Sequence, residues 1–375
     1  MKNLNLISVL FLLCVCLTAV AQTPQAVYVS DAANFNTGPW QIAKFDESGT
    51  YEGALMNVSD GIEWPQDIIF LDSEQAVLIS NLGAAGVISK HEWGTGNFIE
   101  NFAQGLGGPT RMKIGPDNLL YVLQWNNPSG EENVLRFELD GTFVDEFTST
   151  GVPRSIGIDW DSSGDLYVSS YNLSTITKFD GTTGAEIGTF ISGLAGPTNI
   201  FFEASGNLVV FNYNSGVIAR YDPAGNHIED LITGVNGCEG FDFFPNGDIL
   251  IGVGSDGTVR RYDSNFNFLG NFVDTGTLLT PNAIVIRDDI PLSTEENVLE
   301  MVLVTPTIGT SFRISEMALQ KFDEFRVYDS NGKLTVTHLR ADGNTLNTIH
   351  LSEGIYFISA SKDGHRFIQK VVVKR

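Results

Sequence analysis

The sequence is poor in histidine and cysteine, the side chains on which much nucleophilic and metal chemistry depends. It has 5 histidines and 3 cysteines in 375 residues, and no HExxH, CxxC or GxSxG motif. Cys14 and Cys16 lie in the apolar N-terminal segment, so the rest of the chain retains only Cys238 and cannot form an internal disulfide. We expect Cys238 to be a small buried residue. The scarcity of histidine argues against histidine-liganded metal enzymes.

Basic residues are also scarce, with 22 Lys and Arg against 45 Asp and Glu and a formal net charge of −23. Such a surface is repelled by phosphate backbones and anionic membranes, so we expect no nucleic-acid partner. The imbalance belongs to one part of the chain. Residues 22–297 hold 11 basic and 37 acidic residues, a net of −26, whereas residues 298–375 hold 10 and 8, a net of +2.

No apolar run is long enough to span a bilayer comfortably. The candidate run, residues 6–17, follows Lys2 and precedes Ala19-Val20-Ala21, which is the pattern of a secretory signal peptide with its cleavage site. We therefore predict a signal peptide over residues 1–21, with a retained membrane anchor as the alternative. The mature chain is predicted to have no transmembrane segment.

A repeat runs through the acidic part of the chain. In the first recurring motif, a small or apolar residue precedes an anchor residue, and an apolar strand follows it. The anchor residues are Pro65, Pro109, Pro153, Pro197, Cys238 and Pro281. Successive anchors lie 44, 44, 44, 41 and 43 residues apart. A second anchor joins a basic residue, a ring and an acid, as in Arg220-Tyr221-Asp222. His91 takes the ring position in one repeat, so we expect it to be packed inside a sheet.

Each repeat contains four short strands bounded by Gly, Asn and Asp turns. A period in the forties with four strands per unit is typical of a β-propeller. Residues 26–29 match the second strand of a unit, and residues 281–286 match the first strand. We predict an all-β fold in which residues 22–290 form a six-bladed β-propeller with one-plus-three strand closure.

The repeat stops at a polar stretch, residues 291–297, which we interpret as a linker. Beyond it, residues 298–375 alternate apolar and polar side chains between turns at residues 329–332, 342–344 and 362–364. This pattern predicts a small β-sandwich as a second domain.

Two resemblances to known families follow from these motifs. The repeats resemble six-bladed propellers of the NHL-repeat and gluconolactonase-like superfamily, a fold that hosts hydrolases, lyases and binding modules. The tail resembles the C-terminal sorting domain of the type IX secretion system of Bacteroidetes, through Pro306-Thr307, residues 312–314, 327–333 and 354–357, and the basic end at 370–375. One departure is Thr305, where that family usually has Asn.

The second resemblance implies a route and a partner. The chain would be exported to the periplasm, and residues 298–375 would engage the type IX secretion machinery for passage through the outer membrane. The protein is therefore expected to be secreted, either extracellular or attached to the outer-membrane surface.

The first resemblance implies calcium as a cofactor, because gluconolactonase-like propellers place Glu, Asn and Asp ligands at the channel mouth. Suitable oxygen ligands at the start of the innermost strands are Asp67, Asn199, Glu239 and Asn282. Arg111 and Arg154 belong to the same ring of residues and would compete with a cation. The alternative is a channel closed by arginine–carboxylate pairs and water.

The loops after the second strands combine rings with amides. Rings stack and amides form hydrogen bonds, which suits carbohydrate, peptide and other small-molecule ligands. Aromatic residues also brace loops, and Asn is a common turn residue. The residues expected on a ligand-binding face are Trp40, Trp64, Trp125, Asn126, Tyr171, Asn172, Tyr213 and Asn214, together with Arg111 and Arg154.

These observations leave three functions open. The leading hypothesis is an exported module that binds a ligand or partner, with no catalytic residue assigned. The alternatives are a calcium-dependent hydrolase of the gluconolactonase type and a protein-interaction scaffold.

Overall fold

The computed structural model describes residues 24–83, 85–127, 130–288, 303–322, 324–329, 333–336, 345–347, 351–362 and 365–375. The predicted signal peptide (residues 1–21) and linker (residues 291–297) lie outside the described residues. The chain forms two compact units, Met1–Ile290 and Pro291–Arg375.

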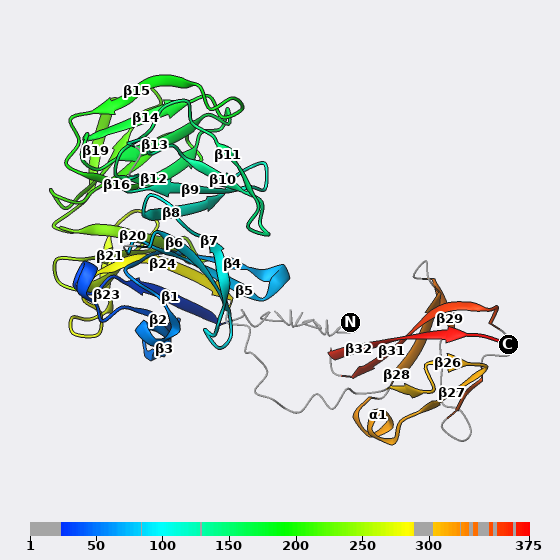
Figure 1. Cartoon of the computed structure of the whole chain (residues 1–375). Helices are drawn as coiled ribbons and strands as arrows, with labels where there is room; N and C mark the ends of the chain where they lie inside the picture. The colour runs from blue at the N-terminus through cyan, green and yellow to red at the C-terminus, as the bar shows by residue number, and fades with distance from the viewer. Residues whose placement is uncertain are drawn as a thin grey trace, which may run out of the picture. The chain divides into compact units, whose positions relative to one another are not determined.

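The larger unit consists of four-stranded antiparallel sheets (Figure 1). The first has the order β24-β1-β2-β3, with β24 Pro281–Asp288, β1 Gln25–Asp31, β2 Gln41–Asp46 and β3 Tyr51–Asn57. The next two contain β4 Pro65–Leu71, β5 Ala76–Asn81, β6 Val87–Glu92 and β7 Phe98–Ala103, and then β8 Pro109–Ile114, β9 Leu120–Gln124, β10 Leu135–Phe137 and β11 Phe143–Glu146.

The later sheets follow the same order along the chain. They contain β12 Ser155–Trp160, β13 Leu166–Ser170, β14 Thr175–Phe179 and β15 Glu186–Ser192; β16 Pro197–Phe202, β17 Leu208–Asn212, β18 Val217–Tyr221 and β19 His227–Thr233; and β20 Cys238–Phe243, β21 Ile249–Val253, β22 Thr258–Tyr262 and β23 Phe268–Val273. Short 3-10 helices occur at η1 Phe35–Thr37, η2 Val58–Asp60 and η3 Asp72–Glu74. The all-β prediction is confirmed.

The second anchor ends the third strand of a sheet and begins a turn. Asp222 Oδ1 accepts hydrogen bonds from the backbone N–H groups of Ala224 at 2.9 Å and Asn226 at 2.8 Å, which closes the turn into β19. The ring of this anchor packs inside the sheet. His91 is fully buried, with Nδ1 2.9 Å from the Gly96 carbonyl oxygen, as predicted. Cys238 is likewise buried.

The first and last strands of the larger unit lie side by side. β24 pairs with β1 so that Ile284 lies opposite Val29. The buried carboxylate of Asp31 extends this contact, because it accepts backbone N–H groups from Ala33 at 2.9 Å and from Thr280 at 2.8 Å. The two ends of this unit are therefore joined by a strand ladder and by a buried side chain.

Neighbouring sheets are tied together by buried hydroxyl groups on their inner strands. Thr110 Oγ1 donates to the Ser155 carbonyl oxygen at 2.7 Å, and Thr198 Oγ1 donates to the Cys238 carbonyl oxygen at 2.9 Å. Each bond satisfies a polar group in the core and fixes the distance between inner strands.

The described residues of the smaller unit form two sheets. One has the order β25-β27-β30, with β25 Val304–Thr305, β27 Ser311–Ile314 and β30 Thr345–Asn347; the other has the order β26-β32-β31-β28-β29, with β26 Ile308–Gly309, β32 His365–Val373, β31 Gly354–Lys362, β28 Glu324–Asp329 and β29 Leu334–Val336. A short helix that was not predicted, α1 Glu316–Lys321, begins at Ser315, whose hydroxyl accepts the Ala318 N–H. No helix in the described part of the chain is long and apolar enough to cross a membrane.

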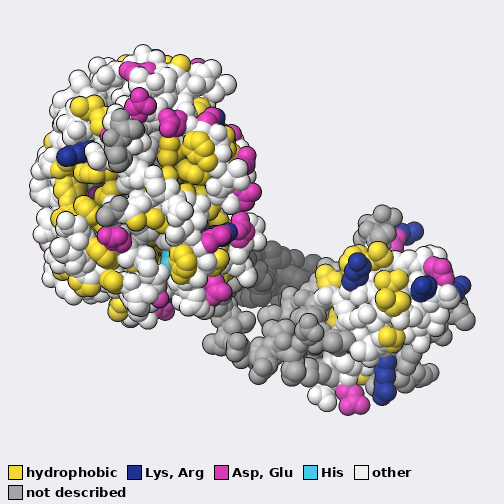
Figure 2. Space-filling view, viewed as in Figure 1, with side chains coloured by type: hydrophobic (Ala, Val, Ile, Leu, Met, Phe, Trp, Pro, Cys, Tyr) yellow, Lys and Arg dark blue, Asp and Glu magenta, His cyan; other side chains and the backbone are white. Residues whose placement is uncertain are grey.

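The surface reflects the uneven charge of the sequence. On the face drawn in Figure 2, acidic side chains are spread over the larger unit, and basic side chains are prominent on the smaller one. The acidic surface therefore belongs to the sheet repeat.

Candidate ligand-binding site

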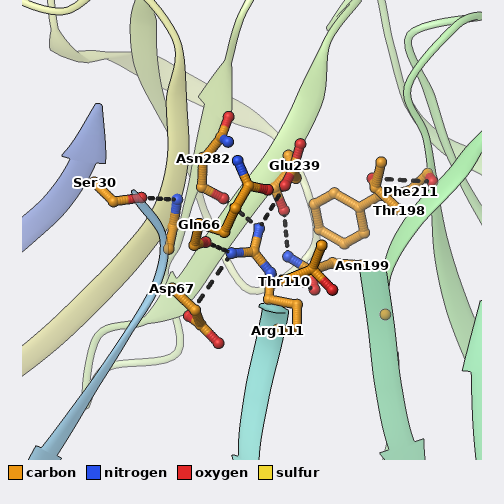
Figure 3. A network of polar contacts seen from close by, with 12 residues as sticks. Ser30, Gln66, Asp67, Thr110, Arg111, Thr198, Asn199, Phe211, Glu239 and Asn282 are labelled. Carbon is orange, nitrogen blue, oxygen red and sulfur yellow. Dashed lines mark hydrogen bonds and ion pairs between the residues drawn. The ribbon is translucent and has the colours of Figure 1, made fainter. Parts of the chain in front are cut away.

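Arg111 lies at the centre of the innermost strands of the larger unit (Figure 3). It comes from β8 and is only 5% exposed. Its Nε donates to Asn199 Oδ1 at 3.2 Å, and its Nη2 donates to Glu239 Oε1 at 3.1 Å. The same guanidinium donates to the backbone carbonyl oxygens of Gln66 and Asn282. Five sheets therefore contribute to one arginine and its partners.

Two buried carboxyl groups share this guanidinium. Asp67 Oδ1 lies 3.7 Å from Arg111 Nη1, and Asp67 Oδ2 accepts the Met112 N–H at 2.8 Å. Burial raises the pKa of Asp67, and the positive charge of Arg111 opposes that rise. Burial also raises the pKa of Glu239 to about 7, again against the effect of Arg111. Arg111 is thus the main favourable charge for both acids.

The four residues predicted as calcium ligands are brought together here, and they surround Arg111. The guanidinium donates to oxygen atoms of Asn199, Glu239 and Asn282 and lies beside the carboxylate of Asp67. A positive charge at this position repels a divalent cation, so in this arrangement the residues do not fit a calcium ion. Within the described ranges, no group of three or more His, Cys, Asp or Glu residues is placed to hold a metal ion.

The two residues that follow an anchor face different spaces in several of the repeats. At four anchors the first residue lines a cavity of about 330 Å³, to which Gln66, Thr198, Glu239 and Asn282 contribute. At four anchors the second residue lines another cavity of about 120 Å³, to which Asp67, Arg111, Asn199 and Ala283 contribute. Successive side chains of a strand point in opposite directions. The polar residues of the predicted site therefore line two cavities, and Arg111 lines the smaller one.

We call the larger of these cavities the aromatic cup. Its walls and floor are formed by Phe35, Asn36, Trp64, Gln66, Trp125, Ile156, Tyr171, Thr198, Tyr213, Glu239 and Asn282. The four polar residues that follow an anchor lie at the floor, next to Arg111 and its partners. Rings from several sheets form the walls.

The rings of the wall touch one another at steep angles. Trp125 and Tyr171 have ring centroids 5.8 Å apart with planes at 41°, and Tyr171 and Tyr213 lie 5.9 Å apart at 80°. Phe35 packs on Trp64 at 5.8 Å and 60°. The rings thus form a curved wall, without a pair of parallel plates.

Trp64 occupies a strained backbone position at the wall of the cup. Its φ is +51°, in the left-handed region that costs a non-glycine residue about 1–2 kcal/mol. The equivalent position before three other anchors is glycine, at Gly108, Gly196 and Gly237, each also with positive φ. Strain of this kind persists where the side chain serves a purpose. Here it places an indole in the cup.

Two amide side chains at the floor of the cup have no hydrogen-bond partner among the described residues. Gln66 is 4% exposed and Asn282 is 2% exposed, and both use only backbone carbonyl groups to bind Arg111. In Figure 3 the amide of Asn282 points away from the guanidinium. The buried Trp64 Nε1 is also unpaired within the described part of the chain. Of these three groups only Trp64 Nε1 is fully buried, where a polar atom is nearly always paired. The two amides line the cup with no bond to the described protein, so they are available to a ligand there.

The structure separates the residues predicted for the ligand-binding face. Trp64, Trp125, Tyr171 and Tyr213 line the cup. The other predicted residues, Trp40, Asn126, Asn172, Asn214, Arg111 and Arg154, are not among its lining residues.

Several of these residues support the wall from outside. Trp40 Nε1 donates to the Phe35 carbonyl oxygen at 2.5 Å, and Asn214 Oδ1 accepts the Tyr171 hydroxyl at 2.9 Å. The guanidinium of Arg154 lies over the Trp125 ring, 5.2 Å from its centroid. Loop bracing, one of the two interpretations considered for these side chains, therefore applies to Trp40 and Asn214.

The floor residue Gln66 was not among the predicted site residues, because a glutamine does not match the Glu, Asn and Asp ligands that the resemblance implies. The signal was nevertheless present, because Gln66 follows Pro65 as Asn282 follows Pro281. Phe35 and Asn36, which also line the cup, belong to the ring-plus-amide stretch Asn34-Phe35-Asn36 of the first unit. Ile156 carries no comparable signal in the sequence.

Comparison with known proteins separates the two units. Residues 307–374 match the family described as the secretion system C-terminal sorting domain. This tail indicates export by the type IX secretion system, as the sequence motifs implied. No curated protein matches the chain.

Solved structures resemble the larger unit in fold. A protein of unknown function from Bacteroides caccae is 15% identical, with a TM-score of 0.56 over 70% of this chain and 99% of its own. A chain of a nidogen–laminin complex is 14% identical, with a TM-score of 0.55 over 70% and 98%. A gluconolactonase from Xanthomonas campestris is 16% identical over 56% and 75%, with a TM-score of 0.45, too low for a functional comparison. The first two likenesses support a propeller-like fold and no particular activity.

Proposed function

We propose that the protein is an exported β-propeller that binds a small ligand in the aromatic cup. The observation that carries this proposal is the pair of buried amides of Gln66 and Asn282, which lack hydrogen-bond partners among the described residues. Their amide atoms are not among the fully buried polar atoms without a partner, so water can bond them in the free protein. A ligand that pairs with both amides and packs against the rings would replace that water.

The cup has this form if the six four-stranded sheets are the blades of a closed propeller. The pairing of β24 with β1 and the correspondence of each predicted repeat with one sheet support this arrangement. A closed ring removes exposed sheet edges. It also holds the cup walls in place before a ligand arrives, which lowers the entropic cost of binding.

The site of action is the cell surface or the medium. Deletion of residues 298–375 is expected to retain the protein in the periplasm, because the sorting tail would be missing. Fractionation followed by immunoblotting measures this outcome. Unchanged amounts at the surface and in the medium would contradict the assignment.

Ligand binding in the cup is tested by a thermal-shift screen of the mature protein against neutral sugars, nucleosides, dipeptides and amino acids. At least one class is expected to raise the melting temperature of the native protein and not that of the Trp125→Ala variant. Asn126→Ala is the matched control, since Asn126 is exposed and lies outside the cup in the same loop. A screen in which no compound distinguishes Trp125→Ala from Asn126→Ala would contradict the proposal.

A calcium-dependent hydrolase is the second candidate, favoured by the convergence of Asp67, Asn199, Glu239 and Asn282. It requires Arg111 to leave its position, because the guanidinium now contacts all four residues. Our proposal predicts that calcium leaves the melting temperature of the native protein unchanged. A calcium-dependent rise, together with lactone hydrolysis that is lost in Glu239→Ala, would favour the hydrolase.

A further inference from the structure

We infer that the ligand of the aromatic cup is a neutral sugar ring, an inference that rests on the proposed function and makes it specific. Three properties of the cup carry it: the hydrogen-bonding groups at the floor, the balance of charge around them, and the orientation of the rings in the wall.

The free groups at the floor match neighbouring hydroxyl groups. Each amide, of Gln66 and of Asn282, offers both N–H donors and a carbonyl acceptor. Glu239 Oε1 accepts a hydrogen bond from Arg111, and its Oε2 has no partner among the described residues. A hydroxyl group donates one hydrogen bond and accepts others, so adjacent hydroxyls on one ring satisfy amides and a carboxylate together.

The charge around the cup disfavours an ionic ligand. Glu239 is the one Asp or Glu side chain among the lining residues, and no Lys or Arg side chain is among them. Its charge is matched by Arg111 at 3.1 Å, so a cation would have to compete with a guanidinium already in place. The acidic surface of the larger unit repels anions. A neutral ligand avoids both penalties.

The wall suits a thick, saturated ring rather than a flat one. A planar heterocycle gains most between parallel plates, whereas Trp125, Tyr171 and Tyr213 meet at 41° and 80°. A sugar ring presents C–H groups on more than one face and can touch rings at several angles. The cavity of about 330 Å³ lies near the lower end of the range for small-molecule sites, roughly 300–1,000 Å³.

The test is a titration of the mature full chain with the methyl pyranosides of glucose, mannose, galactose and xylose. Calorimetry gives affinity, and fluorescence reports on the cup, since Trp64 and Trp125 line it. We expect at least one neutral glycoside to bind and to change the fluorescence. Gln66→Leu and Asn282→Leu should each weaken that binding about three- to tenfold, the effect of losing one neutral hydrogen bond.

Comparison probes separate this inference from the proposed function. They are glucuronic acid, glucosamine, tetramethylammonium, indole and the dipeptide glycyl-phenylalanine, each tested on the native protein and on both leucine variants. If one of these binds more tightly than every neutral glycoside, the sugar assignment is wrong and the cup remains a binding site. If no probe of any class binds, both the assignment and the proposed function fail. Asn172→Ala, outside the cup, is the control expected to bind as the native protein does.

Discussion

The guanidinium of Arg111 lies 3.1 Å from the carboxylate of Glu239, and both side chains are almost completely buried. Glu239 belongs to the floor of the aromatic cup, whereas Arg111 lines the smaller cavity. This ion pair therefore joins the ligand-binding layer to the layer that holds the inner strands together. Its removal should affect stability and binding at once.

Replacement of Arg111 by methionine should lower the free energy of unfolding by about 3–5 kcal/mol, because it leaves buried carboxyl groups without their positive partner. Urea denaturation of the native and variant proteins measures the change. Lys113→Met is the matched control. Lys113 pairs with Asp159 at 2.8 Å, but its side chain is 42% exposed, so its loss should cost less than about 1 kcal/mol. Equal effects of the two substitutions would contradict the central role of Arg111.

Glu239 should make the stability depend on pH in a defined direction. Its pKa is raised from 4.5 to about 7, chiefly by burial, so the folded protein binds a proton between these values that the unfolded chain does not. Stability should therefore fall as pH rises through this window, by at most about 3 kcal/mol from this group. Glu239→Gln should reduce the slope. Burial also raises the pKa of Asp67, so this group contributes to the pH dependence with the same sign. Part of the slope should therefore remain in Glu239→Gln.

The control for this pH dependence is a carboxylate whose pKa is lowered in the folded protein. A hydrogen bond from the Ser48 hydroxyl is the main cause that lowers the pKa of Asp46, which favours the folded state above the ordinary pKa of 3.8. Asp46→Asn should alter the pH profile only in the acid range, where the native protein loses this contribution. A profile between pH 4.5 and 7 that is the same in Glu239→Gln and in the native protein would exclude the predicted proton uptake.

Trp64→Gly should weaken binding in the cup and should destabilise the protein less than Trp64→Ala does. The glycine substitution relieves the positive φ of +51°, a gain of about 1–2 kcal/mol that offsets part of the cost of losing the indole and its contact with Phe35. Both variants should melt below the native protein. Trp64→Ala keeps the strained backbone and removes the indole, so it should be less stable than the glycine variant. A glycine variant that melts below the alanine variant would contradict this explanation.

Asp31→Ala should weaken the junction between the first and last strands of the larger unit. The substitution leaves the buried backbone N–H groups of Ala33 and Thr280 without their acceptor, at a cost of roughly 1–3 kcal/mol for each. Limited proteolysis should then cut first near β1, and the urea midpoint should fall. Asp31→Asn keeps an acceptor oxygen, so its urea midpoint should lie between those of the native protein and Asp31→Ala. Native-like proteolysis of Asp31→Ala would show that the junction does not depend on this carboxylate.

Much of the fold could be predicted because the anchors reflect local physical needs. An acid such as Asp222 closes a turn, and the ring before it fills the interior of a sheet, so both recur at a fixed spacing. Helix α1 gave no such signal, because a six-residue helix has less than two turns and no repeated apolar period to detect. The hydroxyl ties between sheets, such as that of Thr110, depend on pairs of residues far apart in the sequence.

The candidate site was predicted in part. The convergence of Asp67, Asn199, Glu239 and Asn282 followed from their place after the anchors. The sequence also placed Arg111 and Arg154 in that ring and offered arginine–carboxylate pairs as an alternative to calcium, and Arg111 forms such a pair with Glu239. It did not indicate that Arg154 would instead lie over the Trp125 ring, since a long side chain can point along a channel or out of it. Nor did it indicate that Trp40 supports the wall while Trp64 forms it. That difference depends on backbone conformation, which sequence spacing does not report.

Ligand binding in the aromatic cup depends on side-chain amides of Gln66 and Asn282 that are free to bond a ligand. The most direct measurement is a crystal structure of the mature protein grown with a saturating concentration of the methyl glycoside that binds best. We predict a sugar ring in the aromatic cup, with hydroxyl groups bonded to both amides and C–H groups against Trp125 and Tyr171. A structure in which the sugar lies elsewhere, with both amides bonded to protein atoms, would contradict the claim.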